Sequence, residues 1–263
     1  MHIQLATTGS FFVFLFALVR ATAWLAFVPP FSSTGIPQVV RLGLATALSL
    51  AVTSQMGAAG SSLGNNLASL KTGAFIAALV VQATIGALLG FMTSLLLSAV
   101  SSAGALMDLT SGLSASTTFD PLSGAPNPVT ARTYDLFMTT LLFATGGYLL
   151  IVKGFLTSFQ AAGLTERAAH LIGPALVSET AFFFVATLEI AAPVVGCMFL
   201  AYIALGLLTR SAPQLNIMSI GFAINIALAF VVAAATLPLL PVAVTTLVDR
   251  AVSDGLGLLG IRA

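Results

Sequence analysis

The sequence is poor in charged residues and contains almost no cysteine. Only 6% of its 263 residues are Asp, Glu, Lys or Arg, whereas 58% are hydrophobic. A soluble globular domain usually carries about 25% charged residues, so this composition predicts an integral membrane protein. The formal net charge of +1 leaves no basic surface for nucleic acid. The single cysteine, Cys197, excludes an intramolecular disulfide and a cysteine-based zinc site.

The residue groups that catalysis or a bound cofactor would need are also missing. The eight acidic residues are scattered, and none forms a cluster with histidine at the spacing of metal ligands. Gly60 and Gly64 are not followed by the lysine of a phosphate-binding loop. We therefore expect no enzyme activity and no cofactor. A secondary transporter stays an alternative, because Arg20 and Arg210 are ionisable groups inside or beside apolar runs.

Long apolar runs make up most of what is present. A helix of roughly 20 residues crosses the hydrocarbon core of a bilayer, which is about 30 Å thick. The runs therefore predict an all-α fold: a polytopic membrane protein of about six long hydrophobic helices arranged as hairpins. We expect them to form a single membrane domain over residues 1–263. The runs are residues 11–30, 42–56, 72–107, 129–152, 179–208 and 211–248.

Arg20 lies in the middle of the first apolar run, which Pro29 and Pro30 end. An unpaired charge at the centre of a membrane-spanning helix costs at least about 2.5 kcal/mol. Two interpretations follow. In one, the side chain reaches the membrane surface or the span is shifted along the sequence. In the other, Arg20 is a buried arginine that faces a partner.

Small residues recur every four positions in the third run. Gly86, Gly90 and Ser94 begin this series, which continues through two further serines. Such a series lets another helix backbone approach closely. We therefore predict that Gly86, Gly90 and Ser94 pack against another helix, which could belong to this chain or to a partner.

Residues 108–128 read as an irregular loop, rich in Ser, Thr, Gly and Pro. Asp120-Pro121 and Asn127-Pro128 favour turns, because the residue before a proline is pushed out of the helical region. Phe119 is its only aromatic residue. From composition alone, this is a solvated loop between two spans.

The last two runs meet at a polar break from Thr209 to Asn216. Pro213 cannot continue a helix, and the side chains of Arg210, Gln214 and Asn216 can donate to the carbonyls left free. If Pro213 is the apex of a hairpin, Glu189 and Leu237 lie 24 residues before and after it and should end up at similar depths. The break is either an exposed turn or a turn that docks into another protein.

These polar positions resemble the signature of the FliR family of flagellar export-gate proteins, which has related members in virulence secretion. Met218 and Tyr148 depart from the pattern, because the family usually has phenylalanine and histidine there. The matching residues are Arg210, Pro213, Gln214, Asn216 and Gly221, then Arg20, Pro30, Ile36, Pro37 and Arg41 near the N-terminus, and Asp120, Pro121 and Gly124 in the irregular loop.

The resemblance implies a multi-pass protein of the bacterial inner membrane, surrounded by membrane lipid and belonging to the flagellar basal body or to a virulence system. It implies a helical assembly with FliP, FliQ and FlhB that forms and closes a channel for unfolded exported proteins. We expect partner contacts at Arg20, Arg41, Gly86, Gly90, Ser94, Arg210, Pro213, Gln214 and Asn216. The implied pore plug includes Gly112, Ser114, Ser116, Phe119, Asp120 and Pro121.

Overall fold

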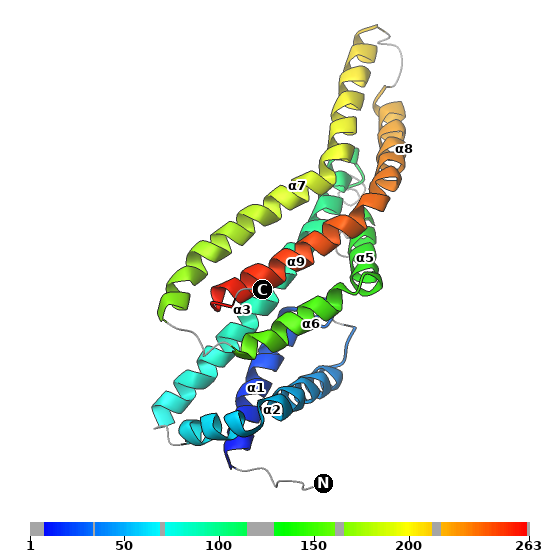
Figure 1. The fold of residues 1–263 in the computed structure, drawn as a ribbon. Helices are drawn as coiled ribbons and strands as arrows, with labels where there is room; N and C mark the ends of the chain where they lie inside the picture. Colours follow the sequence, from blue (N-terminus) through cyan, green and yellow to red (C-terminus); the bar gives the residue numbers. More distant parts are fainter. Residues whose placement is uncertain are drawn as a thin grey trace. The chain divides into compact units, whose positions relative to one another are not determined.

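The computed structural model describes residues 8–33, 35–68, 72–114, 129–160, 166–211 and 217–261. Every regular element in these ranges is a helix, which confirms the all-α prediction (Figure 1). The elements are α1 (Thr8–Phe27), α2 (Gln38–Ala68), α3 (Thr72–Ser111), α5 (Val129–Ala144), α6 (Gly147–Thr157), the 3₁₀ helix η1 (Ser158–Gln160), α7 (Glu166–Ser211), α8 (Ile217–Thr236), the 3₁₀ helix η2 (Leu237–Leu239) and α9 (Leu240–Leu258).

Four stretches in the described part of the chain are long and apolar enough to cross a membrane: Ser10–Phe27, Thr72–Ser111, Ile172–Ser211 and Gly221–Leu258. Counting α5 and α6 together as one bent span brings the number to five. The expectation of about six is therefore close, and a polytopic membrane protein is confirmed. The missing span is the predicted run 42–56, which belongs to the 31-residue helix α2. Small and polar residues extend this helix to Ala68, so it is longer and less apolar than the run predicted.

The predicted run 129–152 is not one straight helix. It breaks between α5 and α6, whose axes differ by 71°. Gly146 lies at the break with φ of +75°, a conformation that side-chain-bearing residues rarely adopt. The N–H of Gly146 donates to the carbonyl of Phe143 at 3.2 Å, which closes the last turn of α5. The glycine therefore ends α5 and redirects the chain into α6.

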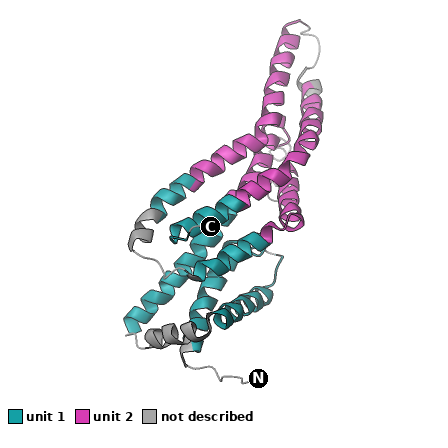
Figure 2. Ribbon diagram, in the orientation of Figure 1, with its two compact units in different colours: residues 1–94, 149–178, 249–263 teal, residues 95–148, 179–248 magenta. Residues whose placement is uncertain are grey.

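The chain folds into two compact units, each built from separate stretches (Figure 2). Unit 1 comprises Met1–Ser94, Leu149–Ser178 and Asp249–Ala263, and unit 2 comprises Leu95–Tyr148 and Glu179–Val248. In unit 1, the ring of Trp24 stacks on Phe155 with centroids 4.4 Å apart. In unit 2, the largest fully buried side chains include Met107, Leu142 and Met198. The single domain predicted over residues 1–263 stays a prediction.

Candidate functional site

Arg20 is the most deeply buried cation that the structure describes, with 2% of its surface exposed. Its Nε donates to Oε1 of Gln82 on α3 at 2.7 Å. Its Nη1 donates to the carbonyl of Ser158 at 2.8 Å and to its Oγ at 3.3 Å. The guanidinium carbon lies 4.3 Å from the centre of the Phe159 ring. Arg20 therefore connects three segments of unit 1: α1, α3 and η1.

The position of Ser158 explains how this charge is tolerated. Ser158 follows the last residue of α6, and a carbonyl at the C-terminal end of a helix favours a cation. Among the described residues, no carboxylate pairs with Arg20. Burial of Arg20 is thus confirmed. The acceptors that Arg20 uses come from its own chain, and a contact of Arg20 with a partner stays a prediction.

The small-residue series of α3 packs closely against α1. A Cβ on Gly86 would collide with the carbonyl oxygen of Arg20. A Cβ on Gly90 would lie 2.7 Å from the carbonyl oxygen of Trp24 and 3.0 Å from Cβ of Phe27. Close packing of these two glycines against another helix is thus confirmed. The helix is α1 of the same chain, and a contact of either glycine with a partner protein stays a prediction. Ser94 is half-buried, and its partner contact stays a prediction.

Arg41 lies in the first turn of α2 and is half-buried. Its Nη2 donates to the carbonyl of Ser33, whereas its buried Nε has no partner. Arg41 lines a groove of about 190 Å³ between α1 and α2. The predicted contact between Arg41 and a partner protein is not tested by this arrangement.

Asp108 is a buried acid that the composition predicted to begin the irregular loop. Instead it lies in the last turn of α3 with 1% of its surface exposed. Its carboxylate accepts hydrogen bonds from the N–H of Thr130 at 2.9 and 3.2 Å and from that of Ala131 at 3.2 Å. Both belong to the first turn of α5. Asp108 thus satisfies helix N–H groups that would otherwise be buried without acceptors.

The close approach of α3 to α5 depends on Gly104. A Cβ at this position would lie 2.7 Å from Cα of Ala131 and 2.8 Å from its nitrogen. The helices are therefore close enough for the short Asp108 side chain to reach the α5 backbone. A lone acid at the end of an uncharged run was the only sequence signal for this contact.

The predicted plug begins just beyond α3. Gly112 has φ of +85°, and a Cβ there would lie 3.1 Å from the ring of Phe222 on α8. The N–H of Ser114 donates to the carbonyl of Asp108 at 3.3 Å. The irregular stretch therefore starts after residue 111 and not at 108. Its other predicted residues, Ser116, Phe119, Asp120 and Pro121, lie outside the described part of the chain, so the plug stays a prediction.

Residues 179–211 of α7 form a hairpin with α8 in unit 2, and its register matches the prediction. Gly221 faces Leu205, because a Cβ on the glycine would lie 3.1 Å from Cδ1 of the leucine. These two residues are each eight positions from Pro213. At the open end, one cavity of about 180 Å³ is lined by Glu189 and Pro193 and by Leu239 from η2. The expectation that the two arms end at similar depths is confirmed.

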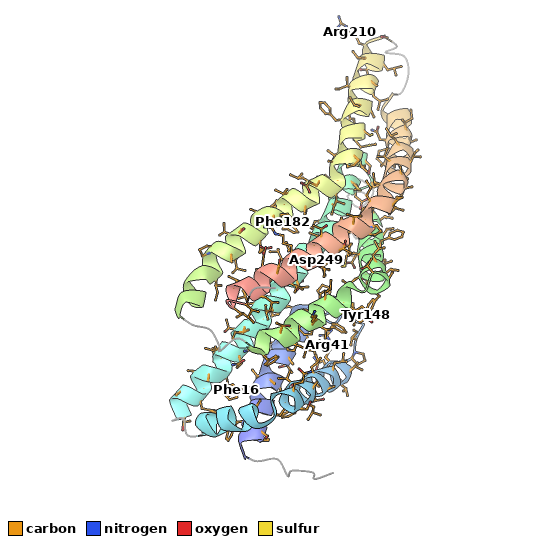
Figure 3. All side chains as sticks on the ribbon, in the orientation of Figure 1. Phe16, Arg41, Tyr148, Phe182, Arg210 and Asp249 are labelled. Carbon is orange, nitrogen blue, oxygen red and sulfur yellow. The ribbon has the colours of Figure 1, made fainter. Side chains whose placement is uncertain are left out.

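Arg210 is exposed in the last turn of α7, at the tip of that hairpin arm (Figure 3). Pro213, Gln214 and Asn216 lie outside the described residues, so the contacts predicted for them are not tested. Both arms expose large apolar side chains to the surroundings. These include Phe184, Leu188, Phe199, Leu200, Ile203, Leu207, Phe230 and Val231.

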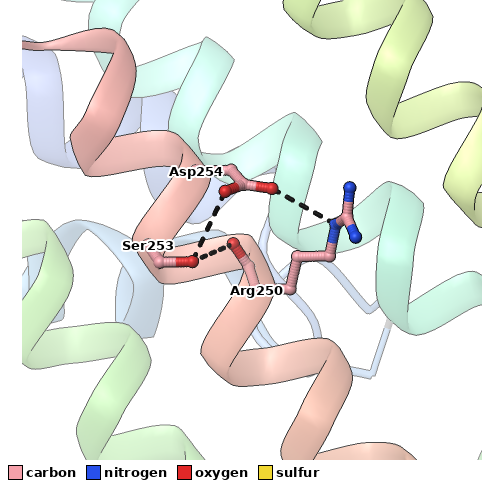
Figure 4. Close-up of polar contacts among 3 residues, drawn as sticks. All are labelled: Arg250, Ser253 and Asp254. Atoms are coloured by element: carbon pink, nitrogen blue, oxygen red, sulfur yellow. Dashed lines mark hydrogen bonds and ion pairs between the residues drawn. The ribbon is translucent and has the colours of Figure 1, made fainter.

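Polar contacts elsewhere among the described residues do not suggest a chemical site. Nε of Arg250 lies 3.2 Å from Oδ2 of Asp254 one turn later on α9 (Figure 4). Both side chains are more than one third exposed, and such pairs contribute little to stability. The described residues contain no group of three His, Cys, Asp or Glu side chains that could hold a metal ion.

Together, the apolar spans and the buried polar contacts define an all-α, multi-pass membrane protein without a recognisable catalytic centre in its described part. The family model for bacterial export proteins, family 1, matches residues 11–251, and the chain belongs to this family. It is therefore a membrane component of a type III protein-export apparatus. The family is one of structural components, whereas the absence of enzyme activity in this chain stays a prediction.

Known relatives are named as flagellar biosynthetic proteins or as surface presentation of antigens proteins. The chain is 30% identical to the flagellar biosynthetic protein FliR of Escherichia coli over 229 residues, which cover 87% of this chain and 85% of the relative. It is 27% identical to FliR of Bacillus subtilis over 227 residues, 83% of each chain. It is 28% identical to the surface presentation of antigens protein SpaR of Shigella flexneri over 145 residues, 55% of this chain and 56% of the relative.

Proposed function

We propose that this chain is a subunit of the flagellar type III export gate in the bacterial inner membrane, at the flagellar basal body. The observation that carries the proposal is the extent of the similarity. The flagellar relatives match more than four fifths of both chains, whereas SpaR of Shigella flexneri matches little more than half. In this role the chain helps FliP, FliQ and FlhB to form and close a channel for unfolded flagellar proteins.

The α7–α8 hairpin offers the surface that assembly requires. Its arms expose Phe199 at 65%, Leu200 at 65% and Val231 at 66%. Lipid or neighbouring helices must cover such side chains, because apolar surface exposed to water costs about 25 cal/mol per Å². Arg210 at the hairpin tip would donate to carbonyls at the end of a partner helix, where the dipole favours a cation.

Association is tested by purification from cells that also produce FliP, FliQ and FlhB. Affinity-tagged chain should retain FliP and FliQ through gel filtration, and it should restore motility to a strain that lacks its own FliR. If the chain instead restores only secretion by a virulence system, the relationship to SpaR describes its function better. Failure to bind FliP or FliQ under conditions that preserve a known gate complex would contradict the proposal.

Channel closure is tested through the loop that follows α3. Deleting residues 114–118 shortens the predicted plug and should make the assembled complex leak ions or small solutes in vesicles. Subunit association should persist, since the deletion leaves α3, α5 and the hairpin intact. The undeleted complex, prepared in parallel, sets the background leak. Saturable uptake of one small molecule by this chain alone would instead show a secondary transporter.

A further inference from the structure

The groove between α1 and α2 in unit 1 combines one cation with an apolar surface. It has a volume of about 190 Å³ and is lined by Thr22, Leu25, Ala26, Gln38, Arg41 and Leu42. Ligand pockets for drug-sized molecules are usually about 300–1,000 Å³, so this groove suits only one end of a larger amphipathic molecule. It lies beside the last two turns of α1, where the candidate span Ser10–Phe27 ends.

This groove contains hydrogen-bond donors that no described acceptor binds. Arg41 uses Nη2 on the carbonyl of Ser33, and no described residue accepts a hydrogen bond from its Nη1. Gln38 is the first residue of α2, and no described acceptor binds its backbone N–H or its side-chain amide. None of the described residues that line the groove is acidic. The positive end of the α2 dipole adds to this charge, so the groove suits an anion.

We propose that this groove binds an anionic phospholipid of the surrounding membrane. The phosphate accepts hydrogen bonds from Arg41 and Gln38, and the adjoining part of the lipid packs on the exposed Ala26 and Leu42. Phosphate groups lie at the ends of membrane spans, which is the depth that the end of α1 sets. The apolar lining favours a lipid over free phosphate, since inorganic phosphate would leave the exposed side chains of Ala26 and Leu42 uncovered. This inference does not depend on the proposed export role.

The test measures lipid retention by the full-length protein in detergent, with phosphatidylglycerol and phosphatidylcholine as probes in separate native mass spectrometry titrations. We expect the wild type to retain phosphatidylglycerol in preference to phosphatidylcholine. Arg41→Gln should weaken phosphatidylglycerol binding by about tenfold, as expected for losing one charge-assisted contact. Arg132→Gln is the matched control and should change nothing. Arg132 is likewise the fourth residue of its helix, but it is exposed and does not line the groove.

A second variant tests the apolar half of the groove without touching the charge. Ala26 is exposed, so Ala26→Trp can fill the groove with little effect on folding, and it should also reduce phosphatidylglycerol retention. Sodium phosphate at millimolar concentration should not compete with the lipid. The proposal is wrong if Arg41→Gln retains phosphatidylglycerol as the wild type does, if phosphatidylcholine binds equally well, or if phosphate alone displaces the lipid. It is also wrong if Arg41→Gln loses only subunit association, because Arg41 then contacts a protein.

Discussion

The α1–α3 contact of unit 1 and the α7–α8 hairpin of unit 2 are built from similar sequence, but they differ in how far their side chains are buried. Each combines long apolar helices with glycines and a single arginine. In the first, Arg20 is 2% exposed, and α3 and η1 supply its acceptors. In the second, Arg210 is exposed at the tip of one arm, and large apolar side chains along both arms are uncovered.

The difference shows that an arginine in an apolar stretch does not by itself mark a contact with a partner. What matters is whether the fold brings acceptors to it. Ser158 lies 138 residues after Arg20, yet its carbonyl is 2.8 Å from Nη1. The described residues offer Arg210 no such acceptor. The α1–α3 contact is therefore complete within one chain, whereas the hairpin is the better candidate for a contact between chains.

The largest effect should come from removing the buried guanidinium. Arg20→Ala leaves the Ser158 carbonyl and the Gln82 side chain without their donor and opens a cavity between α1, α3 and η1. We expect a loss of about 3 kcal/mol of unfolding free energy for the isolated chain in detergent. Arg132→Ala, at an exposed position, should change it by less than about 0.5 kcal/mol. Equal effects of the two substitutions, measured by denaturant or thermal unfolding, would mean that the Arg20 contacts do not stabilise the fold.

Gly90→Leu tests the close contact of α3 with α1. Its side chain would have to displace the Trp24 carbonyl or the Phe27 side chain, so we expect a loss of about 2 kcal/mol, within the usual range for overpacking. Gly73→Leu is the control on the same helix, because a Cβ there meets nothing within 4 Å. Helix propensity should make Gly73→Leu neutral or slightly stabilising. If Gly90→Leu is as stable as Gly73→Leu, the two helices are not in close contact.

Asp108→Ala should have a smaller effect, confined to unit 2. It removes the acceptor of the Thr130 and Ala131 N–H groups and the negative charge at the positive end of α5. We expect a loss of about 1.5 kcal/mol, typical of an N-cap. Asp135→Ala, an exposed acid on the same helix, is the control. Hydrogen exchange should show the first turn of α5 opening faster in Asp108→Ala alone, and unchanged protection there would contradict the capping role.

Arg210→Ala should have the smallest effect on the isolated chain, within about 0.5 kcal/mol of wild type, because the side chain is exposed. In the proposed assembly the same substitution should weaken association by about 1–3 kcal/mol and reduce motility. Arg210→Lys should restore function only in part, since an ammonium group lacks the planar guanidinium fork. If both variants assemble and support motility like wild type, the hairpin tip is an exposed turn.

The sequence by itself determined the class of the molecule and much of its local structure. Low charge and long apolar runs predicted membrane-spanning helices, since a backbone in hydrocarbon must satisfy its own hydrogen bonds. The position of Pro213 predicted the hairpin register that the Leu205–Gly221 contact confirms. The glycine spacing of α3 predicted a close helix contact. Each of these properties depends on residues near one another in the chain.

Only the tertiary structure decided which groups meet across long separations. Nothing near Arg20 in the sequence indicates that Ser158 and Phe159 surround it, or that α1 rather than a partner fills the Gly86 and Gly90 contact. Asp108 likewise looked like a loop residue until α5 brought its N–H groups to the carboxylate. Composition determines that a buried polar group needs a partner, but not which one. Packing brings distant acceptors and donors together, and so separates the groups that the chain satisfies itself from those left exposed.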